Sequence, residues 1–177
     1  MMKTTLRRTA VACLLATLGV ANHAVHADEF GVAAGGMDGY HSLSLNYQKA
    51  PFWEGTLAGH PVDVSLEYSI GAVRAPDDGD SSRTLGRIGL TPFARWRFAS
   101  NTGIEFGIGA NVFSGTHLGD KEISTAFQFS SALGLFHRLE GSPWGLGLRL
   151  THYSNAGIKD PNPGQNYLQL RASYVFP

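Results

Sequence analysis

Residues 62–72 read VDVSLEYSIGA, a stretch in which two kinds of residue alternate from one position to the next. The first set is apolar and contains Val62, Val64, Leu66, Tyr68, Ile70 and Ala72; the second contains Asp63, Ser65, Glu67, Ser69 and Gly71. A strand sends successive side chains to opposite faces, whereas a helix would scatter both sets around its axis. The stretch is therefore predicted to be a β-strand with one apolar and one polar face.

The same period of two recurs along the chain. It is clear in residues 104–112, 144–151 and 168–176, and weaker in residues 29–35, 41–47, 85–98 and 124–137. Pro92 weakens one of these segments, because proline cannot donate to a sheet ladder and usually marks a bulge or an edge. With about eight such strands, we predict an all-β fold, an eight-stranded antiparallel transmembrane β-barrel.

The polar face distinguishes a membrane barrel from a soluble one. It carries charges in mid-strand, at Asp63, Glu67, Arg87, Arg95, Arg97, Glu105, Arg149 and Arg171. Many other positions on this face are glycine, which suits the crowded lumen of a small barrel filled by side chains. Aromatic residues gather near strand ends as candidate interfacial girdles. One girdle comprises Tyr47, Phe52, Trp53, Trp96, Phe98, Trp144, Tyr174 and Phe176, and the opposite one Tyr68, Phe127 and Tyr167.

The N-terminal segment has the order of a secretory signal. Lys3, Arg7 and Arg8 precede an apolar run, and Val25-His26-Ala27 provides small residues at a cleavage site. We therefore predict a cleaved signal peptide over residues 1–27 and a barrel domain over residues 28–177, exported to the bacterial outer membrane. The apolar run is too short to span a bilayer. The mature chain has no cysteine and no basic block, so we expect neither a disulfide framework nor a nucleic-acid partner.

Segment lengths predict the orientation of the barrel. With a periplasmic N-terminus, the connections at residues 74–84, 114–122 and 155–165 are outside loops, and those at 99–103 and 138–143 are periplasmic turns. The connection at residues 49–60 is unusually long for a periplasmic turn.

One pair of residues could carry chemistry. His152 and Ser154 are two apart on a predicted strand, so both share the apolar, lipid-facing side at its outside end. A histidine beside a serine can act as base and nucleophile, and the substrate available at that depth is an ester in the outer leaflet. The alternative is a chance His-x-Ser next to a loop.

The surrounding residues carry a longer motif. The chain reads HYSNAGIK from His152 to Lys159, followed by Pro161-Asn162-Pro163-Gly164. This resembles the signature of the PagL family of lipid A 3-O-deacylases, and the signal, length and place of the motif before the last strand are similar too. The resemblance implies an eight-stranded outer-membrane barrel, often dimeric, that hydrolyses the ester-linked 3-hydroxyacyl chain at the 3-position of lipid A. A lipopolysaccharide substrate and a homodimer are expectations of the same kind. No cofactor is expected, and no metal, because His41, His60, His117 and His137 are scattered without the spacing of metal ligands.

The resemblance also implies a Ser–His–Glu triad on the outer surface, with Ser154 as nucleophile and His152 as base. This chain departs from the family at the third member, because Gly164 is followed by two amides where the family has glutamate. Gln165 is the preferred equivalent. Asn166 is the alternative, since its parity places it on the His152 face, and Asp160 is a substitute acid in the same loop. Exchanging an acid for an amide in a serine-protease triad costs about 10⁴ in kcat, so an impaired deacylase is predicted.

Oxyanion donors are predicted among the backbone N–H groups near Asn155 and Gly157 and at the side-chain amide of Asn162. Ordinary turn formation explains the same residues. The missing acid leaves a second hypothesis open, a non-catalytic outer-membrane barrel that is structural or adhesive and uses its outside loops. Acyl transfer between lipids is not separable from hydrolysis by sequence.

Overall fold

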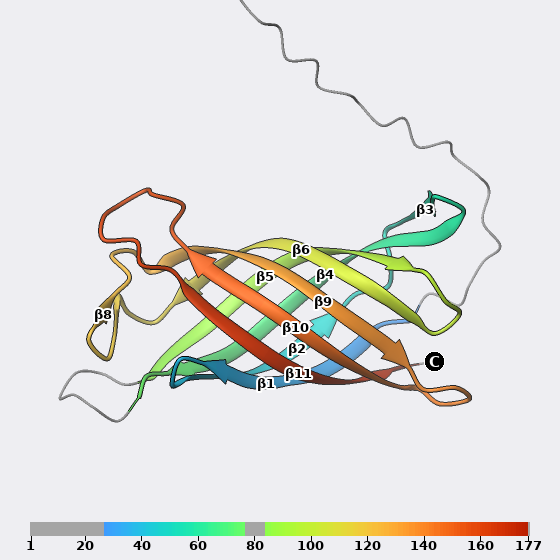
Figure 1. The fold of residues 1–177 in the computed structure, drawn as a ribbon, viewed down its shortest axis with the longest axis horizontal. Helices are drawn as coiled ribbons and strands as arrows, with labels where there is room; N and C mark the ends of the chain where they lie inside the picture. The colour runs from blue at the N-terminus through green and yellow to red at the C-terminus, as the bar shows by residue number, and fades with distance from the viewer. Residues whose placement is uncertain (1–26, 77–83, 177) are drawn as a thin grey trace, which may run out of the picture.

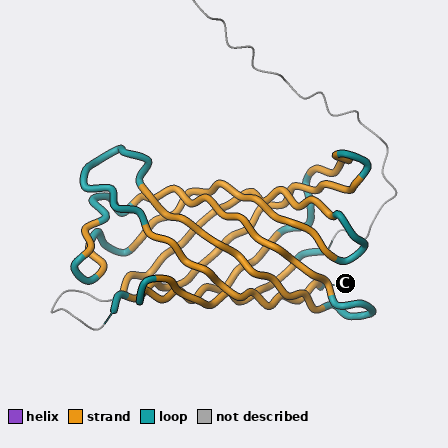
Figure 2. Tube along the Cα trace, in the orientation of Figure 1, coloured by secondary structure: helices purple, strands orange, loops and turns teal. Residues whose placement is uncertain are grey.

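The computed structural model describes residues 27–76 and 84–176 and shows a closed β-barrel (Figures 1 and 2). Nearly all of the predicted signal peptide, and the Asp-rich part of the predicted outside loop at residues 74–84, lie outside these residues. The barrel strands are β1 (Glu29–Met37), β2 (Tyr40–Gln48), β4 (His60–Arg74), β5 (Thr84–Arg97), β6 (Thr102–Phe113), β9 (Phe127–Arg138), β10 (Trp144–Ser154) and β11 (Gln165–Val175). Three shorter strands, β3 (Trp53–Leu57), β7 (His117–Leu118) and β8 (Lys121–Glu122), lie in the connections.

The barrel strands form an up-and-down meander. Each pairs in antiparallel fashion with the strand before and after it, and the pairings of β1 with β11 and of β2 with β4 close the cylinder. This confirms the predicted all-β, eight-stranded antiparallel architecture. In Figure 1 the connection between β10 and β11 and the β7–β8 hairpin lie at the left-hand end, and the C-terminus lies at the right-hand end. Following the predicted orientation, we call these the outside end and the periplasmic end.

The outer and inner faces of the wall have opposite polarity, as the alternation predicts. Large apolar side chains face outward, including Leu170, which is 71% exposed, and Ile70, which is 59% exposed. The lumen holds buried ion pairs: Arg149 contacts Glu67 at 2.8 Å and Glu105 at 2.7 Å. A lipid-facing apolar wall around a paired, charged interior is the arrangement of a transmembrane barrel.

A second set of ion pairs fills the periplasmic half of the lumen. Glu29 accepts from Arg95 at 3.0 Å, from Arg138 at 3.2 Å and from Arg171 at 2.5 Å. Arg95 also contacts Glu105 at 3.2 Å, which links the two sets. Buried charges need such partners, because an isolated ion in a low-dielectric interior is strongly unfavourable.

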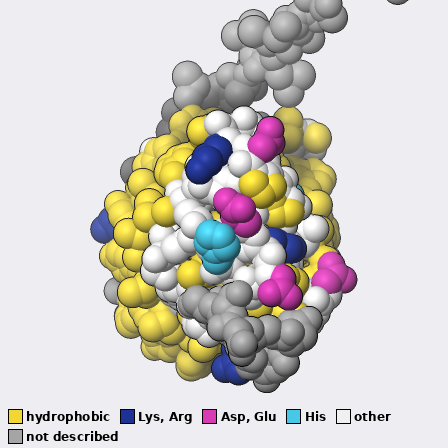
Figure 3. Space-filling view, turned by 90° about the vertical axis from the view of Figure 1, so that its left-hand side faces the viewer, with side chains coloured by type: hydrophobic (Ala, Val, Ile, Leu, Met, Phe, Trp, Pro, Cys, Tyr) yellow, Lys and Arg dark blue, Asp and Glu magenta, His cyan; other side chains and the backbone are white. Residues whose placement is uncertain are grey.

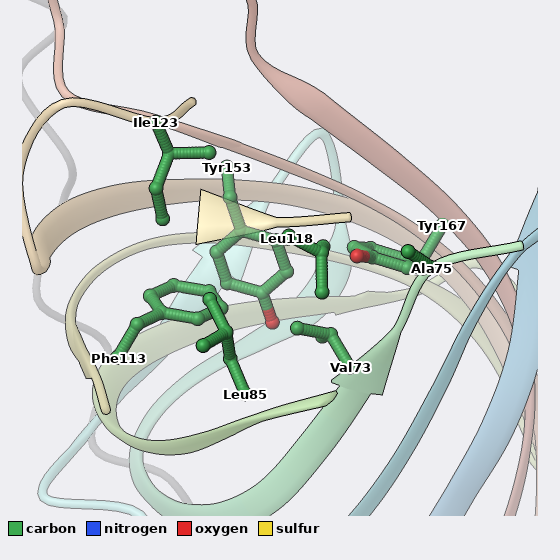
Figure 4. Close-up of a cluster of buried hydrophobic side chains, with 8 residues drawn as sticks. All are labelled: Val73, Ala75, Leu85, Phe113, Leu118, Ile123, Tyr153 and Tyr167. Carbon is green, nitrogen blue, oxygen red and sulfur yellow. The ribbon is translucent and has the colours of Figure 1, made fainter. Parts of the chain in front are cut away.

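The outside end of the lumen is closed by an apolar cluster (Figure 4). Its side chains point toward one another from four strand ends, the start of β11 and the β7–β8 region, and all are buried. They are Val73, Ala75, Leu85, Phe113, Leu118, Ile123, Tyr153 and Tyr167. We call this set the apolar plug. It corrects the assignment of Tyr167 to an aromatic girdle, because that side chain is 1% exposed and faces inward.

Other predictions also need correction. Tyr68 does not belong to a girdle opposite that of Tyr47, because the two residues are register partners whose ring centroids lie 6.3 Å apart. Pro92 marks neither an edge nor a bulge: β5 is paired on both sides, and its register with β6 is the same before and after the proline. At the periplasmic end the predicted aromatic cluster is present, with the Trp144 and Tyr174 ring centroids 5.1 Å apart.

The long connection at residues 49–60 contains the short strand β3, which pairs with the first residues of β4. Its turn is made by Ala58 and Gly59, both with positive φ. The described residues include no helix long and apolar enough to cross a membrane.

Candidate active site

His152 and Ser154 lie at the end of β10 that leads into the connection to β11, and on the outward face of the barrel, as predicted. Both are half-buried, and the residue between them, Tyr153, points inward into the apolar plug and is 5% exposed. The neighbouring strand β9 places Ser131 opposite His152 and Phe129 opposite Ser154. The inward tyrosine therefore fixes which way the two polar side chains face.

The third polar residue of this face is Asn166. It is the register partner of His152 on β11, and its Oδ1 lies 2.8 Å from the imidazole Nδ1. Because an amide oxygen is only an acceptor, His152 donates Nδ1–H in this bond. In the neutral imidazole the proton is then on Nδ1 and Nε2 carries the free lone pair, which is the tautomer a general base at Nε2 requires.

Gln165 does not occupy the position predicted for it. It pairs with Tyr153, so its side chain turns to the inner face, where it is 7% exposed. Its Oε1 accepts from Lys121 Nζ at 2.5 Å. The physical reason is strand parity, since neighbours on a strand point to opposite faces and Asn166 takes the outward one. Asp160 is exposed, and among the described residues no hydrogen bond joins it to His152.

The connection from residue 155 to 164 is organised by Asn155, which is fully buried. Its backbone N–H donates to Asn162 Oδ1 at 3.0 Å, and its side chain donates to the Lys159 carbonyl at 2.6 Å. Its Oδ1 accepts from the Gly157 N–H at 2.9 Å. The N–H groups of Asn155 and Gly157 themselves are therefore both engaged inside the loop and are not free to bind an oxyanion in this arrangement. Asn162 uses its carbonyl here, and only its NH₂ group is left to donate.

Gly164 leaves room for the His152 ring because it has no Cβ. Its φ is +66°, and a Cβ at this position would lie 2.7 Å from His152 Cε1. Only glycine combines this backbone conformation with so close an approach to the ring. Sequence reasoning treated Gly164 as part of a turn, although its place beside the predicted triad position was the available signal.

The outside loop between β6 and β9 supports the outside loop between β10 and β11. Ser124 Oγ donates to the Pro161 carbonyl at 2.6 Å, and Lys121 Nζ reaches the Gly164 carbonyl at 3.4 Å. Burial lowers the pKa of the Lys121 ammonium, and the charge of Asp38 acts in the opposite direction. Neither Lys121 nor Ser124 was expected from sequence, because contacts between separate loops leave no periodic signal. Figure 3, which looks onto this end, shows charged and histidine side chains on the end face and hydrophobic side chains around its rim.

A histidine with an acceptor at Nδ1 and a serine two residues away on the same strand face are the residue types that nucleophilic acyl chemistry uses. The described residues contain no group of three or more side chains suited to hold a metal ion. Fold and site together define the class: a small outer-membrane β-barrel with a Ser–His pair on its outer surface.

Comparisons with known proteins identify the family. The sequence profile described as lipid A 3-O-deacylase (PagL) matches residues 40–175. The chain belongs to this family. It is 40% identical over 142 residues to the lipid A deacylase PagL of Bordetella bronchiseptica, covering 78% of each chain. It is 32% identical over 128 residues to the lipid A deacylase PagL of Pseudomonas aeruginosa, covering 69% of this chain and 68% of the relative.

Two solved structures share the fold. The crystal structure of the outer membrane enzyme PagL superposes with a TM-score of 0.71 at 22% identity, over 84% of this chain and 99% of that one. The outer membrane protein Ail of Yersinia pestis has a TM-score of 0.51 at 14% identity, over 85% of this chain and 99% of the other.

Proposed function

We propose that the chain is a lipid A 3-O-deacylase that hydrolyses the ester-linked 3-hydroxyacyl chain at the 3-position of lipid A in the outer leaflet. The observation that carries this proposal is the His152–Asn166 hydrogen bond, which holds the imidazole with Nε2 as its basic nitrogen. Family membership supplies the substrate class, and the lipid-facing position of the pair suits an ester that lies in the membrane.

The reaction proceeds in two halves. Ser154 Oγ attacks the ester carbonyl while His152 Nε2 takes the hydroxyl proton; the intermediate then expels the sugar 3-oxygen, which receives that proton. Water attacks the acyl–serine ester, His152 takes a proton from the water and returns it to Ser154, and the 3-hydroxy fatty acid leaves. The side-chain NH₂ of Asn162 is the oxyanion donor that we propose.

The amide at the third position limits this chemistry. Asn166 keeps the tautomer and orientation of His152, but it carries no charge to stabilise the imidazolium as it forms. We therefore propose an active but slowed enzyme. The same amide is the observation that favours the second candidate function, a non-catalytic structural or adhesive barrel.

The test is mass spectrometry of lipid A from cells expressing the chain, with Ser154→Ala and Ser131→Ala as a matched pair. Ser131 is the other serine beside His152 on the outward face, on the neighbouring strand. We expect loss of one ester-linked 3-hydroxyacyl chain in the wild type and Ser131→Ala, and none in Ser154→Ala. Activity lost only with Ser131→Ala would move the nucleophile to β9, and unmodified lipid A in every sample would favour the non-catalytic barrel.

Export and assembly belong to the same proposal. Cleavage of residues 1–27 predicts a mature protein that begins at Asp28, which intact-mass measurement of the outer-membrane form tests. A homodimer, as the family resemblance implies, predicts a cross-linked species of twice the mass in native membranes.

A further inference from the structure

The β7–β8 hairpin lies beside the last outside loop and is held there by the apolar plug. Leu118 is 2% exposed and Ile123 is 8% exposed, and both pack in the plug with Tyr153 and Tyr167. The hairpin is therefore fixed to the same inward tyrosines that set the outward direction of His152 and Asn166. A polar side chain on this hairpin acts from a defined position.

Lys121 is that side chain. Its Nζ donates to Gln165 Oε1 at 2.5 Å and to the Gly164 carbonyl at 3.4 Å, and it lies 4.5 Å from the centroid of the Tyr40 ring. A cation held by two oxygens and an aromatic face is strongly localised. Lys121 thus holds Gln165, the first residue of β11, through its side chain, and Gly164, the residue just before the strand, through its backbone carbonyl.

The segment that Lys121 holds, residues 164–166, lies against the His152 ring at two of its residues. Gly164 lies against Cε1, and Asn166 accepts from Nδ1. A shift of residues 164–166 would loosen the ring and lengthen the hydrogen bond that sets its tautomer. Misplacement of a catalytic group by about 1 Å can cost about 10² in rate.

We infer that Lys121 is a positioning residue for His152, acting through Gly164, Gln165 and Asn166 from a loop remote in sequence. The inference rests on the proposed deacylase function for its kinetic test. It also predicts that the natural amide at Gln165 serves the lysine, not the histidine.

The experiment compares the full-length outer-membrane protein with Lys121→Met, Lys121→Arg and a matched control, Lys49→Met. Lys49 lies at the other end of the barrel, where it too pairs with an oxygen, of Asp28 at 3.4 Å, and lies 5.7 Å from a tyrosine ring centroid. We expect kcat on purified lipid A in detergent micelles to fall about tenfold in Lys121→Met with KM unchanged. Lys121→Arg restores most of it, and Lys49→Met changes neither constant.

A double-mutant cycle separates positioning from direct substrate contact. If Lys121 acts through the His152–Asn166 bond, Lys121→Met costs little once Asn166→Ala has removed that bond. Additive losses, or a rise in KM with kcat unchanged, would overturn the inference, since they indicate that the ammonium meets the substrate independently.

A readout without catalysis keeps this test distinct from that of the proposed function. In ¹⁵N-histidine spectra of the micelle-bound protein, with His152 assigned by its loss in His152→Gln, the wild type shows one tautomer protonated on Nδ1. Lys121→Met is expected to show a mixture of the two tautomers. Unchanged spectra refute the positioning role even if the wild type proves inactive, whereas inactivity with changed spectra refutes only the deacylase.

Discussion

Replacing Asn166 with aspartate should accelerate the enzyme. The exchange preserves side-chain length, so the 2.8 Å contact with His152 Nδ1 is kept and the neutral acceptor becomes an anion. Two unit charges about 4 Å apart attract by about 1 kcal/mol in water and about 4 kcal/mol at the effective dielectric of a protein surface. Asn166 is exposed, so the surface value of the attraction is the upper bound for this pair. Each 1.36 kcal/mol of transition-state stabilisation is a factor of ten in rate. We therefore expect kcat to rise about 10- to 100-fold, less than the about 10⁴ of buried triads, because the tautomer is already correct.

The assay is the initial rate of 3-hydroxy fatty acid release from lipid A in micelles, with Ser154→Ala as the inactive control. Gln165→Glu is the matched control, an amide-to-acid change one residue away whose new carboxylate faces Lys121 on the inner side. We expect less than a twofold change from it. A large gain in Gln165→Glu with none in Asn166→Asp would refute the assignment of Asn166 as the partner of His152.

Three further predictions address the support around the site and the barrel. Gly164→Ala should lower kcat at least tenfold in steady-state kinetics, because the added Cβ displaces the His152 ring. It should also destabilise the fold by about 1–2 kcal/mol in thermal unfolding, because residue 164 has a positive φ. Glu29→Gln should destabilise the barrel by about 3–5 kcal/mol by leaving buried guanidinium groups without their anion, and unchanged urea unfolding in micelles would contradict this. The hydrogen bond from Tyr47 lowers the pKa of Asp28 from its ordinary 3.8. The stabilisation by the ionised Asp28 carboxylate is therefore present above pH 3.8 and is lost as the pH falls through the lowered pKa. In Asp28→Asn, the unfolding rate measured below pH 3.8 should rise less steeply with acid than in the wild type.

The barrel could be predicted from sequence because its physics is periodic. A wall with lipid on one side and charges on the other imposes a period of two on every strand, and residues 62–72 display it without interruption. The charged residues of the lumen follow from the same parity. Their partners do not: Arg149 meets Glu67 across 82 positions of sequence, and that contact depends on strand tilt and register, which no local pattern encodes.

The features that sequence reasoning missed are short or non-local. β3 has five residues and no clear alternation, and its best signal was the Ala58-Gly59 turn between two short extended segments. Lys121 and Ser124 act between loops, where neither period nor motif spacing applies. The engagement of the Asn155 and Gly157 N–H groups inside their own loop likewise depends on how the chain turns back on itself.

The residue that pairs with His152 could be found from sequence: Asn166 was the parity-based alternative, although Gln165 was preferred. On β11 the lipid-facing residues have even numbers, from Leu168 to Tyr174, so odd-numbered residues face inward. Extending that parity back two positions puts Tyr167 and Gln165 inside and Asn166 outside. The preference for Gln165 set the resemblance to the family motif above strand geometry. β11 is already regular at its first residue, where Gln165 pairs with Tyr153, so strand parity decides which side chain faces outward. A shift of one residue along the strand separates a contact with His152 from a contact with Lys121.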